Sequence, residues 1–223
     1  ESLGILEQSF NKILVVGIGG SSQGSKAINH FLNEKRVQYI DHLNSVKIND
    51  LLNNTQLDET GFIFVSKSGQ TSETLTIFEY MIKKLDGNID FSKNFYSFTE
   101  NASSPLRDLS IQKSIKTIEL NNDIGGRFSI FSNNSLIPSF YFNRDLFTEF
   151  FNGGRRALED KDQIKNMAEE DFKRIKNGKS IFAYLIYGDE LIEIGNWRKQ
   201  LYAESLGKNA KGVLPVVSEM PKD

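Results

Sequence analysis

Short apolar runs recur along the first 120 residues and alternate with longer stretches that are richer in polar positions. The runs cover residues 13–16, 37–40, 62–65, 95–98 and 117–120. A continuous apolar run of this length is typical of a strand that is buried on both faces of a parallel sheet. The stretches between the runs are long enough for crossover helices, most clearly over residues 22–33 and 72–85. The alternation predicts an α/β fold in which a parallel sheet forms the middle layer.

The rhythm of the chain changes after about residue 148. Gly153-Gly154 and Arg155-Arg156 lie in a segment from Phe150 onward that predicts a polar, strongly charged helix to about Lys176. An apolar run at 180–187 then predicts a strand, and residues 190–206 predict the helix that follows it. We therefore expect a first domain over residues 1–148. Residues 149–223 are expected to form a linker helix and the truncated start of a second domain, whose sheet holds roughly one strand.

Composition and charge narrow the class of protein. The chain has 223 residues, of which 39% are hydrophobic and 25% charged, and its formal net charge is -2. Because acids and bases are interspersed, neither a nucleic-acid backbone nor a membrane surface is expected as a partner. The sequence contains no cysteine, which favours neither a disulfide-stapled secreted domain nor a thiolate zinc site, and a cytoplasmic location is expected. Its apolar runs are far shorter than the roughly 20 residues of a membrane span.

The segment "VSKSGQTSET", residues 65–74, gathers hydroxyl groups between a predicted strand and a predicted helix. Open α/β sheets bind ligands at the carboxyl ends of their strands, and helix N termini present unpaired N–H groups that attract anions. Hydroxyls of Ser66, Ser68, Thr71 and Ser72 would therefore make a cradle for one phosphate group. Serine and threonine are also ordinary helix caps, and the loop taken alone favours that simpler interpretation.

Two further loops are rich in glycine. Gly17-Ile18-Gly19-Gly20-Ser21 follows the first predicted strand, but Ser22 occupies the last position of G-x-G-x-x-G, so it is not a dinucleotide fingerprint. In Gly125-Gly126-Arg127-Phe128-Ser129, two glycines let the backbone pass close to another group, and Arg127 brings a permanent charge suited to a developing oxyanion. Taken alone, this third loop favours a surface turn with a solvated arginine.

The segment "WRKQLYAESLGK", residues 197–208, predicts a helix with a functional face. Trp197, Gln200 and Glu204 are spaced so that they share one side of the helix. Gly207 is expected to end the helix in the left-handed conformation. A glutamate on a helix is ordinarily solvated, so Glu204 becomes informative only together with the other motifs.

Taken in order, "GIGGSSQGSKA", "SKSGQTSET", "GGRFSIFS" and "QLYAESLGK" resemble the sequence blocks of glucose-6-phosphate isomerases, a family built from two sugar isomerase (SIS) domains. The resemblance runs over essentially the whole chain. It implies a three-layer α/β sandwich and the reversible conversion of glucose 6-phosphate to fructose 6-phosphate through a cis-enediol intermediate. It also implies a sugar phosphate as the ligand, no metal or other cofactor, and a homodimer for the full-length enzyme.

The resemblance also assigns roles to individual residues. Arg127 matches the arginine that stabilises the enediolate, and Glu204 matches the glutamate that moves the proton between C1 and C2. This pairing agrees with the chemistry, because moving a proton between carbons beside a carbonyl requires a nearby carboxylate and a cationic or donating group near the oxygens. The residues that match substrate-binding positions are Gly20, Ser21, Ser66, Lys67, Ser68, Thr71 and Gln200.

The chain departs from the family pattern in two places. A Gln-His block that assists ring opening and a lysine near the C terminus have no match here, since His30 and His42 lie at other positions. We therefore expect the chain to be part of a longer protein. The wording "KSGQTS" is also close to bifunctional phosphoglucose/phosphomannose isomerases, which leaves mannose 6-phosphate open as a substrate. A non-catalytic sugar-phosphate-binding SIS module is the other alternative, and the presence of Glu204 with Arg127 favours the enzyme.

Overall fold

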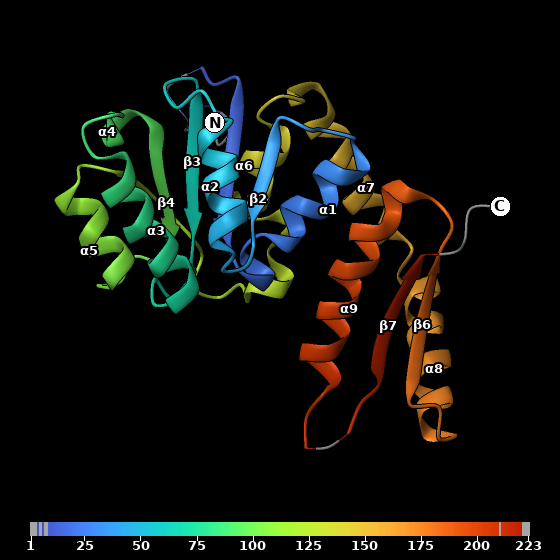
Figure 1. The fold of residues 1–223 in the computed structure, drawn as a ribbon. Helices are drawn as coiled ribbons and strands as arrows, with labels where there is room; N and C mark the ends of the chain where they lie inside the picture. The colour runs from blue at the N-terminus through green and yellow to red at the C-terminus, as the bar shows by residue number, and fades with distance from the viewer. Residues whose placement is uncertain (1–3, 5, 7–8, 210, 220–223) are drawn as a thin grey trace.

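A parallel sheet with helices on both faces forms the larger part of the fold, and a smaller sheet follows it (Figure 1). This is a computed structural model, and it describes residues 4, 6, 9–209 and 211–219. The large sheet has five strands in the described chain, in the order β2-β1-β3-β4-β5. They are β1 (Lys12–Gly17), β2 (Val37–Ile40), β3 (Thr60–Val65), β4 (Phe95–Thr99) and β5 (Lys116–Glu119). The predicted α/β fold is confirmed, and each predicted strand lies within two residues of the observed bounds.

Two layers of helices enclose this sheet. One face is covered by α2 (Ser45–Asn53), α3 (Ser72–Leu85), α4 (Phe91–Asn94) and α5 (Pro105–Gln112), and the other by α6 (Asn133–Phe140) with α1 (Gln23–Phe31) beside it. Successive residues of β3 point to opposite faces, so that Phe64 joins the core under α3 while Ile63 joins the core under α6. Every residue of β3 is buried, which explains its continuous apolar run.

The order of the strands reverses direction at β1. This strand pairs in parallel with β2 on one side and with β3 on the other. The register places Gly17, the last residue of β1, opposite Val65, the last residue of β3. The loops that follow these two strands therefore leave the sheet side by side, at the kind of switch point where open α/β sheets bind ligands.

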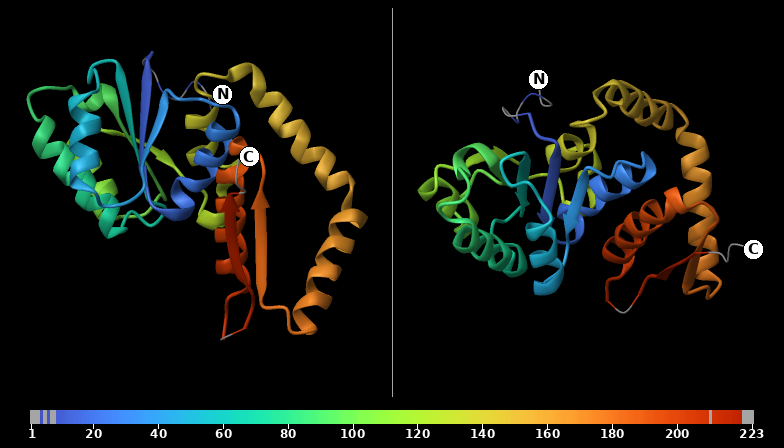
Figure 2. Two further views of the ribbon diagram at one scale, coloured as in Figure 1. Left: turned by 45° about the vertical axis from the view of Figure 1, so that its right-hand side comes forward. Right: turned by 45° about the horizontal axis from the view of Figure 1, so that its top comes forward.

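Two long helices lead from the large sheet to the small one (Figure 2). After η4 (Arg144–Leu146), the chain forms α7 (Phe147–Glu159) and α8 (Lys161–Lys176). The expectation of one continuous charged helix is wrong, because Asp160 has φ -94° and ψ 45°, outside the helical region. The Gly153-Gly154 pair, in contrast, lies inside α7.

The small sheet has two parallel strands in the described chain, β6 (Ile181–Ile186) and β7 (Leu214–Glu219), joined through η5 (Asp189–Leu191) and α9 (Ile192–Leu206). The expectation of roughly one strand is therefore wrong. β7 was not predicted because it contains Pro215. A proline argues against a strand unless it lies in an edge strand or near a strand end, and Pro215 is the second residue of β7. Gly207 follows α9 as expected, but its φ of -78° is not left-handed, so the predicted cap conformation is wrong.

Candidate functional site

Three loops and one helix meet beside the carboxyl ends of β1 and β3. We call them the glycine loop (residues 17–21), the hydroxyl loop (residues 65–72), the arginine loop (residues 125–131) and α9. Within the arginine loop, residues 126–131 form the short helix η3 (Gly126–Phe131). Gly20, Ser21, Lys67 and Gly126 line one small cleft, so the cleft joins the three loops.

The glycine loop and the arginine loop touch through their backbones. A Cβ on Gly20 would lie 2.5 Å from the carbonyl carbon of Gly126 and 2.7 Å from the amide nitrogen of Arg127. No side chain fits there without moving the backbone. Ser129 Oγ donates to the carbonyl oxygens of Gly20, at 3.2 Å, and of Gly126, at 2.7 Å. The close approach that the glycines predicted is therefore the approach of these two loops to each other.

Arg127, Gln200 and Glu204 come together from distant parts of the sequence. Gln200 Nε2 donates to Glu204 Oε1 at 2.8 Å, which confirms that both lie on one face of α9. Arg127 Nη1 lies 3.9 Å from Glu204 Oε2, and its Nε donates to Ser205 Oγ at 2.9 Å. Gln200 also reaches the glycine loop, because a Cβ on Gly19 would lie 3.0 Å from its Nε2.

The hydroxyl loop does not act as a helix cap. Thr71 is the N-cap residue of α3, yet its side chain makes no capping hydrogen bond. Its hydroxyl lies 2.9 Å from the hydroxyl of Ser66, which is completely buried. Ser68 is exposed, and its Oγ accepts the N–H of Gln70 at 3.2 Å. The simpler interpretation of the loop as a side-chain cap is therefore wrong, and the first turn of α3 keeps its N–H groups free of such a cap.

Lys67 connects the loops that follow three neighbouring strands. Its Nζ donates to the carbonyl oxygen of Asn122 at 2.7 Å and lies 3.2 Å from Glu100 Oε1. Glu100 follows β4, and Asn122 follows β5. The charge of Lys67 is balanced by a carboxylate, so the hydroxyl loop offers hydroxyl and N–H donors rather than a cluster of free positive charge.

The two histidines lie apart from the cleft. His30 Nδ1 is 3.5 Å from the carbonyl oxygen of Glu190, and His42 Nδ1 is 2.7 Å from Asp41 Oδ1. Among the residues that the structure describes, no three His, Cys, Asp or Glu side chains gather where they could hold a metal ion. The same described part of the chain contains no helix with the length and apolar character that a membrane crossing requires.

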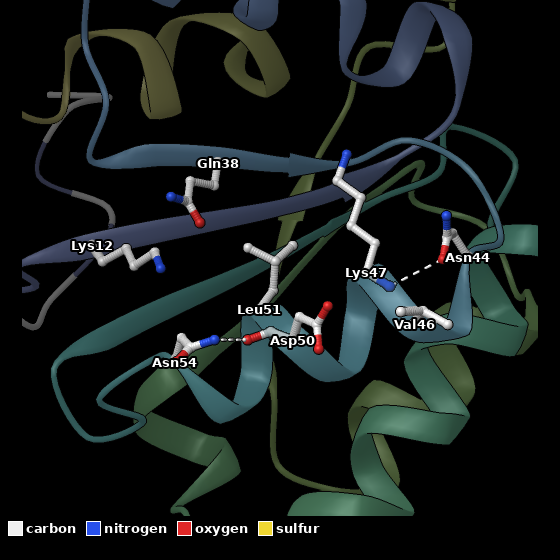
Figure 3. Close-up of a pocket in the computed structure, with 8 residues that line it drawn as sticks. All are labelled: Lys12, Gln38, Asn44, Val46, Lys47, Asp50, Leu51 and Asn54. Atoms are coloured by element: carbon white, nitrogen blue, oxygen red, sulfur yellow. Dashed lines mark hydrogen bonds between the residues drawn. The ribbon is translucent and has the colours of Figure 1, made fainter.

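A larger pocket lies beside the edge strand β2, where Figure 3 shows it between this strand and α2. Its volume is about 480 Å³. It is lined by Lys12, Gln38, Asn44, Val46, Lys47, Asp50, Leu51 and Asn54. Two of its polar side chains serve the ends of α2 itself: Asn44 Oδ1 accepts the backbone N–H of Lys47, and Asn54 Nδ2 donates to the carbonyl oxygen of Asp50. None of the predicted site residues lines this pocket, so size does not identify the candidate site.

Comparison with known proteins assigns the chain to a family. The sequence model of phosphoglucose isomerase matches residues 2–211. The chain belongs to the phosphoglucose isomerase family.

Relatives in this family extend well beyond the length of the chain. The glucose-6-phosphate isomerase of Methanocaldococcus jannaschii is 30% identical over 223 residues, which cover 96% of this chain and 55% of that protein. The glucose-6-phosphate isomerase of Clostridioides difficile is 30% identical over 236 residues, which cover 95% of this chain and 52% of that protein. The chain thus spans about half the length of these curated relatives.

Solved structures show the same fold. A hypothetical protein from Thermus thermophilus has a TM-score of 0.83 and 27% identity, covering 100% of this chain and 56% of the other. A glucose-6-phosphate isomerase from Chlamydia trachomatis has a TM-score of 0.82 and 24% identity, covering 97% of this chain and 46% of the other. The second likeness concerns the fold alone.

Sequence reasoning missed the residues that hold the motifs of the phosphoglucose isomerase family in place. Ser205 is the clearest case, since it accepts a hydrogen bond from Arg127 across 78 positions of sequence. Asn134, on α6, donates to the carbonyl oxygen of Ser21 at 3.3 Å and to Ser129 Oγ at 2.9 Å. A serine or asparagine within a helix carries no sequence signal for such a partner, because the pairing depends on how the loops meet.

Proposed function

We propose that this chain forms part of a glucose-6-phosphate isomerase and carries both its sugar-phosphate cradle and its proton-transferring glutamate. The observation that supports this most strongly is the meeting of Arg127, Gln200 and Glu204 at the glycine loop, in a chain of the phosphoglucose isomerase family. A module that only binds sugar phosphates needs a phosphate cradle but has no use for a carboxylate placed beside an arginine.

In this proposal the phosphate lies at the N terminus of α3, where the helix dipole and uncapped N–H groups attract an anion. Ser68 and Thr71 donate their hydroxyls to it. Ser66 is buried and acts through its hydrogen bond to Thr71, whose orientation it holds. Neutral hydroxyl and N–H donors hold the phosphate by several moderate hydrogen bonds. This arrangement is compatible with release of the product after each turnover.

The sugar lies against the glycine loop, at Gly20 and Ser21, and Lys67 shapes the floor of the cleft. In the glucose 6-phosphate direction, the carboxylate of Glu204 takes the proton from C2 of the open-chain aldehyde. The C1–C2 double bond forms, and the charge that develops on the oxygens is stabilised by the guanidinium of Arg127. Glu204 then returns the proton to C1 while the hydroxyl proton on O2 passes to O1, which leaves the C2 ketone of fructose 6-phosphate.

Gln200 keeps the base in place. Its side-chain N–H groups donate to Glu204 Oε1 and lie close to Gly19, so the carboxylate is tied to the loop that faces the sugar. The Glu204 side chain is 48% exposed and that of Arg127 26% exposed, which leaves both accessible to a ligand.

The proposal includes the organisation of the longer protein. Residues 1–148 form the first sugar isomerase domain, and residues 149–223 form a linker and the start of a second domain of the same type. This division is supported by the change from the large sheet to the small one after α7 and α8. A cytoplasmic homodimer is the assembly that we propose for the complete enzyme.

Steady-state kinetics of the complete protein test the function. Wild type is expected to interconvert glucose 6-phosphate and fructose 6-phosphate, and Arg127→Gln is expected to lower kcat by about 10²–10³-fold, the usual effect of removing an oxyanion-stabilising donor. Arg155→Gln, on the exposed side of α7, is the matched control and keeps the wild-type rate. Binding of fructose 6-phosphate without turnover by wild type would support a binding module instead, and comparable turnover of mannose 6-phosphate would indicate the bifunctional isomerase.

A further inference from the structure

Glu193 lies near the start of α9. Side chains from α1, a helix that belongs with the large sheet, hold it in place. Gln23 Nε2 donates to Glu193 Oε2 at 2.9 Å and to the carbonyl oxygen of Glu193 at 3.3 Å. Lys26 Nζ lies 3.4 Å from Glu193 Oε1. The side chain of Glu193 is only 14% exposed. Both carboxylate oxygens of Glu193 are therefore bound by α1, the helix that follows the glycine loop. Figure 1 shows α1 and α9 as ribbons.

This contact is extended by a second ion pair. Lys26 Nζ also lies 2.9 Å from Asp41 Oδ2, in the loop after β2. Burial alone would lower the pKa of Lys26, but the hydrogen bonds and charges of Asp41 and Glu193 raise it. Lys26 therefore stays protonated and joins three segments of the chain, and its position does not depend on Glu193 alone.

We call the contacts of Glu193 with Gln23 and Lys26 the clamp. The position of Glu193 along α9 connects the clamp to the end of the helix that carries Glu204. Glu193, Trp197, Gln200 and Glu204 are spaced by four, three and four residues, which places them along one face. The distance from Glu193 to Glu204 along the axis is about 16 Å at roughly 1.5 Å per residue. At the α1 end, Gln23 lies two residues after Ser21 of the glycine loop. α9 thus contacts α1 through Glu193 and contacts the glycine loop, which directly precedes α1, through Gln200.

Apolar packing beside the clamp is incomplete. A groove of about 400 Å³ is lined by Ala27, Ile28 and Phe31 of α1, by Ile194 and Trp197 of α9, and by side chains of η3, α6, η4 and α7. Side chains that face a groove lose the dispersion contacts that a filled seam would give. The hydrogen bonds and the ion pair of Glu193 are therefore polar contacts that join α9 to α1 beside a part of the seam that apolar side chains do not fill.

We propose that Glu193 is a positioning residue for the isomerase reaction, which sets the register of α9 so that Glu204 meets Arg127 at the glycine loop. The inference rests on the proposed function. It assigns no contact with substrate to Glu193, whose effect passes through the rigid helix. It also explains why α9 carries a mostly buried carboxylate where it contacts α1.

Kinetics of the complete protein test this role. Glu193→Ala is expected to lower kcat about 10–100-fold, since a displacement of about 1 Å at the reacting groups costs about 10²-fold. The KM for fructose 6-phosphate is expected to stay within about twofold, because the hydroxyl loop is built on β3 and does not contact α9 through Glu193. Glu193→Gln keeps an acceptor for Gln23 and is expected to recover most of the rate. A purely structural role would instead lower the urea midpoint and leave kcat per folded molecule unchanged.

A double-mutant cycle sharpens the test. Gln23→Ala removes one side of the clamp, and the double variant with Glu193→Ala is expected to be no slower than Glu193→Ala alone, because both changes remove the same contact. Glu170→Ala is the control. The carboxylate of Glu170 pairs only with Lys173 of the same helix among the ion pairs of the described residues, so kcat is expected to stay unchanged. If Glu193→Ala does not fold, Gln23→Ala carries the test: it removes a donor to Glu193 and is expected to lower kcat, and an unchanged kcat would overturn the positioning role.

Two results are kept apart by assaying wild type first. No isomerisation by wild type would contradict the proposed function. An active wild type whose kcat is insensitive to Glu193→Ala, or fully additive effects in the cycle, would overturn the positioning role alone.

Discussion

Replacing Gly20 by alanine tests whether the glycine loop and the arginine loop must touch through their backbones. The new Cβ would lie 2.5 Å from the carbonyl carbon of Gly126, 2.7 Å from the amide nitrogen of Arg127 and 2.9 Å from the carbonyl oxygen of Gly126. Non-bonded carbon atoms prefer about 3.5–4.0 Å, so the two loops have to separate by about 1 Å. Overpacking of this kind costs about 1–3 kcal/mol of unfolding free energy. The displaced backbone carries Arg127, so kcat of the complete protein is expected to fall about 10²-fold.

The facing glycine supplies a matched control. A Cβ on Gly126 would lie 3.6 Å from the Cα and carbonyl carbon of Gly20, an ordinary contact. Neither glycine has a positive φ, so backbone strain does not distinguish them. Urea unfolding of the 223-residue chain, followed by circular dichroism, is expected to show a loss of less than about 1 kcal/mol for Gly126→Ala, as for a change without overlap. The reasoning is refuted if Gly20→Ala loses no more stability than Gly126→Ala.

Three other predictions concern separate parts of the molecule. Replacing Ser68 and Thr71 together by alanine is expected to raise the KM for fructose 6-phosphate at least about tenfold, because hydrogen bonds to a charged group contribute about 1.5–3 kcal/mol each; an unchanged KM would exclude this phosphate site. Hydrogen bonds from Arg36 hold the pKa of Glu34 at about 2, below its unfolded value of about 4.3. The stabilisation is therefore present above about pH 4.3 and is lost as the pH falls towards about 2. Glu34→Gln should lower the urea midpoint at pH 7, and a gap from wild type that stayed constant down to about pH 2 would contradict this. The outer face of the β6–β7 sheet exposes Leu185, so the 223-residue chain is expected to bind a hydrophobic dye and Leu185→Lys to bind less; equal binding would rule out this face.

The elements that sequence could predict are those whose signal is local. Strand β3 is apolar at nearly every position because both of its faces are covered, and the bounds of α3 follow from its own helical pattern. The break at Asp160 and the strand around Pro215 were missed. The strand depends on pairing with β6, which is distant in sequence, whereas the break lies at an exposed residue between two helices. A non-helical aspartate and a proline in an edge strand have no local pattern that distinguishes them from their alternatives.

The candidate site also has parts that the sequence predicts and parts that it does not. The motifs located Arg127, Gln200 and Glu204, because the type and spacing of these residues fit a known chemistry. Sequence did not show that Ser205 holds Arg127 or that Glu193 joins α9 to α1, since those contacts arise only when two units of the chain meet. The uncapped N terminus of α3 was also beyond sequence reasoning, because a serine-rich loop before a helix looks the same whether or not it caps the helix.

The proton that Glu204 is proposed to carry can be followed directly in heavy water. With fructose 6-phosphate as substrate, the complete wild-type protein is expected to introduce solvent deuterium at the carbon that receives the proton. Glu204→Gln keeps the size of the side chain but removes the base, and exchange is expected to fall by about 10²–10⁴-fold, the usual contribution of a positioned general base. Binding of a sugar-acid phosphate analogue is expected to change little. Exchange that persisted near the wild-type rate in Glu204→Gln would show that another group moves the proton and would contradict the central claim.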